Sequence, residues 1–265
     1  MRSDIREPAV AGSYYEHDAS RLRSSVAALL DAALPAPDTA TALIAPHAGY
    51  AYSGPIAASA FRGLEARQFE RVIVIGPSHF VAFRGIAASG ARGFSTPLGT
   101  VALDTEAEAA LERAGSVSVA PHVHAPEHCI EVELPFLQVA LRQPFRLVAL
   151  VVGEALPQEV ATVLDALWAE ATLLVVSSDL THFLDYDTAK AADHATAEAI
   201  STLARDDFTA EEACGATAIN GLVSLARRRG LVGRTLDLRS SGDVCGGRDS
   251  VVGYGAWAFR PLDSC

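Results

Sequence analysis

Cysteine is scarce in this 265-residue chain, and long hydrophobic runs are missing. The four cysteines are widely spaced and form no CxxC pair, which argues against a disulfide framework and against a structural zinc site. No apolar run is long enough to span a bilayer, and the N-terminal residues lack the apolar segment of a secretory signal. We therefore expect a cytoplasmic protein in which Cys129 and Cys214 are buried free thiols.

Positive charge is also in short supply, with 21 Lys and Arg residues against 32 Asp and Glu residues and a net charge of -11. An acidic surface repels the phosphates of nucleic acids and of anionic lipids, so we expect neither nucleic acid nor a membrane as a partner. Half of the residues are hydrophobic, which is enough to build a sizeable core.

Near-continuous apolar runs alternate along the chain with segments of helical periodicity. The runs read as buried strands of a parallel sheet, and they cover 42–47, 71–76, 145–152 and 172–178. Helices are expected between and around them, at 19–34, 157–170, 188–205 and 215–229. We predict an α/β fold with a mainly parallel central sheet and helices on both faces, as one domain over residues 1–265.

Turn-forming residues set two local expectations. Residues 49–54 predict a turn, after which Pro55 opens a helix that ends near Leu64. Residues 85–89 and 99–103 predict the two strands of a short hairpin.

Three apolar runs are each followed by a histidine, namely His47, His79 and His182. Ligands of open α/β sheets bind just beyond the carboxyl ends of the strands, so these side chains could converge on one cleft. A single histidine in such a place more often caps a strand or sits in the core. Two in matching positions, His47 and His79, favour a shared metal, because imidazole is the commonest metal ligand.

Several residues could complete such a site with an anionic ligand: Cys245, Asp179, Glu127 and Glu131. Cys245 lies in a glycine-flanked loop, and as a thiolate it would add charge and a soft donor. A plain buried thiol explains the same residue equally well.

Asp179 and His182 lie on one turn after the third run, a spacing typical of an acid–base pair or of a carboxylate that orients an imidazole. Asp179 could also cap the following helix. His128, beside Glu127 and Glu131, is a weaker ligand candidate, and His122 and His124 are expected at the surface of a polar loop.

Taken together, the motifs resemble those of the Memo-like family, called AmmeMemoRadiSam system protein B in prokaryotes. The resemblance runs in order along nearly the whole chain through AGSYY at 11–15, PHAGY at 46–50, YSG at 52–54, GPSH at 76–79, EHCIEVELPF at 127–136, SSDLTH at 177–182, Cys214-Gly215, and Cys245 ahead of YGA at 254–256.

The resemblance implies a fold similar to that of class III extradiol dioxygenases, which are non-haem iron enzymes. It implies that His47, His79 and Cys245 line the cleft as metal ligands, and that His182 and Asp179 match further pocket residues, with His182 in the position of an acid–base histidine. A cysteine replaces the carboxylate of the dioxygenases, which argues against ring cleavage. The implied cofactor is iron or copper, with zinc as an alternative. The implied partners are AMMECR-type and radical-SAM proteins.

Three functions follow as hypotheses. The leading one is a redox-active protein that binds copper or iron. The second is a dioxygenase-like enzyme with a small aromatic substrate. The third is a non-catalytic module that binds a peptide or a small molecule in the cleft.

Overall fold

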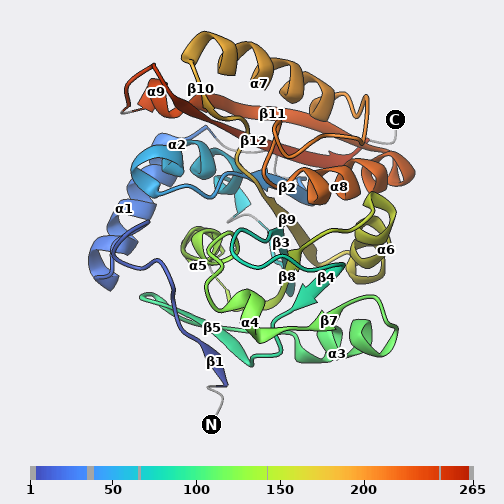
Figure 1. Ribbon diagram of the computed structural model, residues 1–265. Helices are drawn as coiled ribbons and strands as arrows, with labels where there is room; N and C mark the ends of the chain where they lie inside the picture. Colours follow the sequence, from blue (N-terminus) through green and yellow to red (C-terminus); the bar gives the residue numbers. More distant parts are fainter. Residues whose placement is uncertain (1–3, 35–38, 65–66, 142, 245, 263–265) are drawn as a thin grey trace.

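In the described part of the chain, the centre of the fold is a nine-stranded sheet with helices on both faces (Figure 1). The computed structural model describes residues 4–34, 39–64, 67–141, 143–244 and 246–262. The predicted α/β class is confirmed, although the sheet is mixed at its edges. Among the described residues, no helix has the length and apolarity needed to cross a membrane.

Four parallel strands form the middle of this sheet. Their order is β2 (Ala42–Ala45), β9 (Thr172–Ser177), β3 (Arg71–Pro77) and β8 (Arg146–Val152). All four arise from the predicted apolar runs. Their carboxyl ends therefore meet at one edge of the sheet, where ligands bind in open α/β folds.

Shorter or antiparallel strands extend the sheet on both sides. On one side β12 (Val251–Pro261) runs antiparallel to β2 and also pairs with β11 (Leu231–Ser240) and β10 (His182–Leu184). On the other side β4 (Ile86–Ala88) is antiparallel to β8 and parallel to β7 (Ser118–Val119).

Alternate residues of the central strands point to two separate hydrophobic clusters, as expected for a sheet covered on both faces. Val72 and Val74 belong to one cluster, and Ile73 and Ile75 belong to the other. The first cluster includes residues from α1 (Ala19–Ala32), α2 (Tyr50–Phe61) and α5 (Leu134–Ala140). The second includes residues from α6 (Pro157–Leu167), α7 (Tyr186–Ser201) and α8 (Ala216–Arg229).

Capping residues explain where α1 begins and where α8 ends. The Asp18 side chain accepts a hydrogen bond from the backbone N–H of Arg21 and caps α1. Gly230 ends α8 in the left-handed conformation, with φ of 64°.

The predicted turn at 49–54 is wrong, because α2 already begins at Tyr50 and carries Pro55 in its second turn. The Ser53 hydroxyl donates to Ala48 O and the Tyr50 hydroxyl donates to Val132 O. These bonds and the burial of Tyr50 and Ser53 stabilise a helix that the local glycine and proline disfavour.

The predicted hairpin is also wrong in its pairing. The strand β6 (Gly99–Ala102) pairs with β5 (Gly93–Thr96), and β5 pairs with β1 (Ile5–Arg6) in a separate three-stranded sheet. The other expected arm, β4, joins the central sheet instead. Hydrogen bonding to β8 thus takes precedence over the nearest strand in sequence.

Among the described residues, further helices lie in the connections. They are α3 (Thr105–Arg113), α4 (Pro121–His124), the 3-10 helix η2 (Glu131–Glu133) and α9 (Ser241–Val244). The segment from α4 to α5 brings a group of buried polar residues close to the carboxyl ends of β2 and β3.

Candidate metal centre

Three histidines from separate parts of the chain meet beyond the carboxyl ends of β2 and β3. One ring nitrogen from each of His47, His79 and His128 lies within 4.8 Å of the others. The ring centroids are 5.1 Å apart for His47 and His79, 5.4 Å for His47 and His128, and 4.6 Å for His79 and His128. This spacing could hold one metal ion.

His47 is held rigidly on both its backbone and its ring. Its backbone N–H donates to Asp179 Oδ1 at 2.8 Å, and its Nδ1 lies 2.7 Å from Ser177 Oγ. Burial, and then the neighbouring His79, lower the pKa of His47 to about 3. The imidazole is therefore neutral at pH 7, which is the form that binds a metal.

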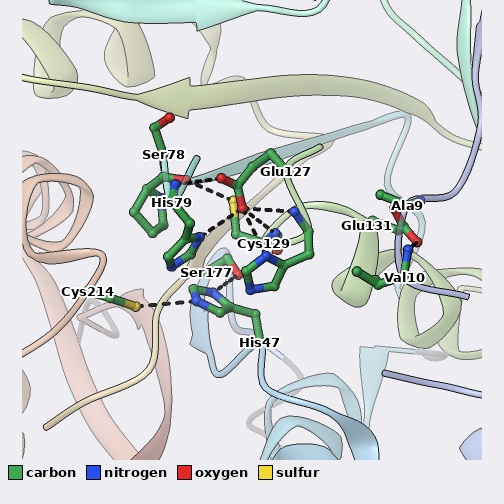
Figure 2. Close-up of polar contacts among 12 residues, drawn as sticks. Ala9, Val10, His47, Ser78, His79, Glu127, Cys129, Glu131, Ser177 and Cys214 are labelled. Atoms are coloured by element: carbon green, nitrogen blue, oxygen red, sulfur yellow. Dashed lines mark hydrogen bonds and ion pairs between the residues drawn. The ribbon is translucent and has the colours of Figure 1, made fainter. Parts of the chain in front are cut away.

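His79 is oriented by the carboxylate of Glu127. Its Nδ1 lies 2.8 Å from Glu127 Oε1, and its backbone N–H donates to Glu127 Oε2 at 2.7 Å (Figure 2). The side chain of His79 is 27% exposed, so the centre is accessible on this side. A carboxylate behind Nδ1 fixes the tautomer in which Nε2 is free for a ligand.

Glu127 is a buried anion that binds several donors at once. Its Oε1 also accepts from the backbone N–H groups of His128 and Cys129, at 2.8 Å and 3.1 Å. Burial alone raises the pKa of Glu127, but the hydrogen bonds and charge of His79 and the backbone donors outweigh it and lower this pKa to about 2.

His128 is the third histidine of the group. Its Nδ1 lies 3.3 Å from Glu127 Oε1 without forming a hydrogen bond, which leaves this buried atom unpartnered. Burial, then His47 and His79, lower the pKa of His128 to about 4. Like His47, its imidazole is neutral at pH 7 and can act as a metal ligand.

The Cys214 thiol lies close to Nε2 of His47, the ring nitrogen that does not contact Ser177. Its Sγ is 3.3 Å from His47 Nε2, and Figure 2 shows the side chains of His47, His79 and Cys214 turned toward one another. Burial, then the charge of Asp179, raise the pKa of Cys214 to about 12. The protonated thiol can therefore donate to His47 Nε2. Cys129 and Cys214 are both free thiols, as expected. Cys129 is fully buried, but the expected burial is wrong for Cys214, whose accessible surface is intermediate.

The other predicted site residues have different positions. Cys245 lies outside the described residues. Asp179 is buried beneath the backbone of His47, and burial raises its pKa against the hydrogen bond from His47. His182 begins β10, and its Nδ1 lies 2.8 Å from Leu180 O.

Glu131, an alternative anionic ligand, is used elsewhere. Its carboxylate pairs with Arg6 and accepts hydrogen bonds from the Tyr15 hydroxyl and from Ala9 N and Val10 N. Of the two histidines expected at the surface, His122 is exposed, but the expectation is wrong for His124, which is 1% exposed. The His124 Nε2 is 3.0 Å from Ala87 O, so the fold buries this ring under β4.

From the sequence, His128 is a weaker ligand candidate than His47 and His79, yet its ring lies in the same group. The signal that points to it is its neighbour Glu127, a carboxylate that contacts both His79 and the backbone of His128.

A cavity of about 510 Å³ adjoins the centre. Ser78, the neighbour of His79, and Cys214, which contacts His47, both line it. Apolar side chains complete much of its wall, among them Val81, Phe83 and Val152. The cavity has the size and mixed lining typical of small-molecule sites.

The residues fit a transition-metal ion. Two of the imidazoles are neutral at pH 7 because burial lowers their pKa, and a carboxylate behind the third fixes its orientation. The buried, unpartnered Nδ1 of His128 is an atom that a ligand could satisfy. Imidazole donors suit iron, copper and zinc.

Comparison with known proteins shows the family of this chain. A family model described as Memo-like protein matches residues 6–258. The chain is 34% identical to a MEMO1 family protein of Methanopyrus kandleri, over 96% of this chain and 99% of that protein. It is 30% identical to one of Nitrosopumilus maritimus, over 96% and 99%, and 34% identical to one of Aeropyrum pernix, over 95% and 98%. With matches that span nearly the whole chain, the protein belongs to the Memo-like family.

Proposed function

We propose that this protein binds a redox-active transition metal, iron or copper, through His47, His79 and His128. The observation that carries the proposal is the convergence of the three ring nitrogens within 4.8 Å of one another. The pKa of His47, lowered to about 3, and that of His128, lowered to about 4, keep both rings in the metal-binding form at pH 7. A bound iron or copper ion would supply one-electron redox chemistry and Lewis acidity.

Cys245 is proposed as a further donor to the same ion. The residue follows α9, whose last residue is Val244, and α9 contacts both β12 and α2. Its thiolate would add the anionic ligand that the three imidazoles do not supply. Zinc suits this donor set as well as iron and copper do, so the metal itself has to be measured.

Asp179 and His182 are proposed as the groups that position and move protons. Asp179 accepts from the backbone N–H of His47 and holds this ligand in place. His182 Nδ1 can donate to Leu180 O, which makes Nε2 the atom that takes a proton. An imidazole in that tautomer is suited to general acid–base work.

Metal content tests the proposal. Untagged protein purified without oxygen is analysed by elemental mass spectrometry beside the single variants His47→Ala, His79→Ala and His128→Ala. The matched control is His122→Ala, which removes an exposed histidine. We expect near-stoichiometric iron or copper in the wild type and the control. Each ligand variant should retain less metal, because its affinity for the metal should fall by roughly tenfold or more. Equal metal content in all five proteins would refute the proposal.

Cys245→Ser separates the two ligand sets. Metal lost in this variant and retained in His128→Ala would replace His128 by Cys245 as the third ligand. Metal lost in both would make them joint ligands.

A dioxygenase-like activity is a second candidate, favoured by the cavity of about 510 Å³ beside the centre. A small aromatic molecule could fit there against the apolar side chains of Val81 and Phe83. Oxygen uptake by iron-loaded protein with a panel of catechols tests this candidate, with His182→Ala as the variant expected to lose activity and keep its iron. No uptake across the panel would argue against it.

A further inference from the structure

Three glutamates of one short segment are almost fully buried, and only two of them have the partners that an anion needs. Glu127 is 3% exposed, and Glu131 and Glu133 are 0% exposed. A buried carboxylate without donors or a cation is strongly disfavoured, and such a group takes up a proton instead. The partners of each carboxyl group therefore report its protonation state.

Glu127 and Glu131 satisfy this requirement as anions. Glu127 accepts from three backbone N–H groups and from a ring nitrogen. Glu131 pairs with the Arg6 guanidinium and accepts from the Tyr15 hydroxyl and two backbone N–H groups. Every oxygen of these two groups has a hydrogen-bond donor.

Glu133 differs from both. Its Oε1 lies 2.8 Å from Ser177 Oγ, its Oε2 has no hydrogen-bond partner, and among the described residues no Lys, Arg or His forms an ion pair with it. Burial, opposed by the Ser177 contact and reinforced by Asp179, raises the pKa of Glu133 well above its usual value.

Ser177 then decides where the protons lie. Its Oγ has three neighbours at hydrogen-bond distance: His47 Nδ1 at 2.7 Å, Cys129 O at 2.7 Å and Glu133 Oε1 at 2.8 Å. A hydroxyl donates one hydrogen and accepts at two lone pairs. The Cys129 carbonyl can only accept, so the single Ser177 hydrogen goes to it. Both other neighbours must therefore donate to Ser177.

We propose that Glu133 is a neutral carboxylic acid that donates to Ser177 and thereby, as a positioning residue, holds His47 in the tautomer that carries its proton on Nδ1. In that tautomer the lone pair of His47 is on Nε2, the atom that faces Cys214. An ionised Glu133 would draw the Ser177 hydrogen to itself and leave the Cys129 carbonyl facing an oxygen lone pair.

The tautomer of His47 matters for metal binding through the proposed role of His47 as a ligand, on which this part of the inference rests. With Nδ1 protonated and hydrogen-bonded, Nε2 is free for the metal without a change of tautomer. Glu133 thus acts on the ligand His47 through two hydrogen bonds, one to Ser177 and one between Ser177 and the His47 ring. As a neutral group it adds no negative charge to the centre.

Two measurements on metal-free protein test the proton positions without relying on metal binding. The first is infrared difference spectroscopy at pH 7, between wild type and Glu133→Gln, in H₂O and in D₂O. We expect an isotope-sensitive C=O band of a protonated carboxylic acid that Glu133→Gln removes. The matched control is Glu108→Gln, which deletes another buried acid, whose pKa burial raises to about 7. This control should leave the Glu133 band in place.

The second measurement is ¹⁵N NMR of the His47 ring, where protonation on Nδ1 is expected in wild type and in Glu133→Gln. Absence of the carboxylic acid band, or a His47 ring protonated on Nε2, would overturn the inference. Either NMR result can be read in the wild type alone, even if a variant folds poorly.

Metal titration separates the inference from the proposed function. Glu133→Gln keeps a neutral donor toward Ser177, so its metal affinity should stay within about twofold of wild type, whereas Glu133→Met should bind about 3- to 10-fold more weakly. Equal weakening in both variants would show that Glu133 acts as an anion and would overturn the inference. A wild type that binds no metal but shows the band and the Nδ1 proton refutes the proposed function and supports the assignment of Glu133.

Discussion

Replacing Glu127 by glutamine should destabilise the protein and weaken the metal centre together. The Glu127 carboxylate accepts four hydrogen bonds, three of them at Oε1. Glutamine offers one oxygen and one NH₂ group in the same volume. If its oxygen takes the place of Oε1, its NH₂ group faces the backbone N–H of His79, and two donors are left opposed.

The lowered pKa of Glu127 gives the size of the effect. The pKa falls from 4.5 to about 2 on folding. A group with a lowered folded-state pKa contributes stability that is fully present above pH 4.5 or so and is lost as the pH falls through about 2. A difference of about 2.5 pH units corresponds to about 3 kcal/mol at pH 7, and the side chain is only 2% exposed, so little of it is screened by solvent.

We therefore expect Glu127→Gln to lower the free energy of unfolding by about 3 kcal/mol at pH 7, and the Tm by about 6–12 °C. Urea unfolding at pH 7 and at pH 3 measures both the loss and its pH dependence. The difference between variant and wild type should shrink as the pH approaches 2, because wild-type Glu127 is then protonated as well. Glu112→Gln, in an exposed position, is the matched control and should change stability by less than about 0.5 kcal/mol.

A loss below about 1 kcal/mol at pH 7, or a loss that is the same at pH 3, would refute this reasoning. The same variant should bind the metal about 10- to 100-fold more weakly, because Glu127 orients His79 and is 3.3 Å from the ring of His128. Unchanged affinity would show that the histidines are positioned without it.

Further changes test the surroundings of the centre. Arg6→Met leaves the buried Glu131 carboxylate without its cation, so urea unfolding should show a loss of about 3–5 kcal/mol, and a loss under about 1 kcal/mol would mean that Tyr15 and the backbone donors suffice. Gly76→Ala places a Cβ 2.6 Å from Cys129 Sγ and should cost about 1–3 kcal/mol by the same assay, whereas Gly247→Ala, with no atom within 4 Å, should be neutral. A chelator should lower the Tm of the wild type but not that of His47→Ala, and equal shifts in scanning calorimetry would disconnect the metal from His47.

The central strands could be predicted because their sequence signal is local. Apolar runs bounded by glycine, proline and serine are buried on both faces of a parallel sheet, and β3 and β9 follow the predicted runs closely. The convergence of His47 and His79 followed from the same signal, since the carboxyl ends of parallel strands meet at one edge.

The third histidine could not be placed in this way, because its position depends on contacts distant in sequence. The segment that carries His128 is held by Glu127, which binds the loop after β3, and by Glu131, which binds Arg6 near the N-terminus. Neither contact leaves a periodic pattern. The burial of His124 and the pairing of β5 with β6 were missed for the same reason. Both depend on the pairing of β4 with β8 in the central sheet, which is also distant in sequence.

The charge states of the three glutamates in segment 127–133 determine how much negative charge lies near the centre. Glu127 is the anion that contacts an imidazole nitrogen, Glu131 is neutralised by Arg6 away from the cluster, and the proposed neutral state of Glu133 adds nothing. With His47 and His128 also uncharged at pH 7, a divalent ion in this place would keep a net positive charge. That charge is the physical reason to expect an anionic further ligand, either the Cys245 thiolate or an acidic group of a small molecule in the adjoining cavity.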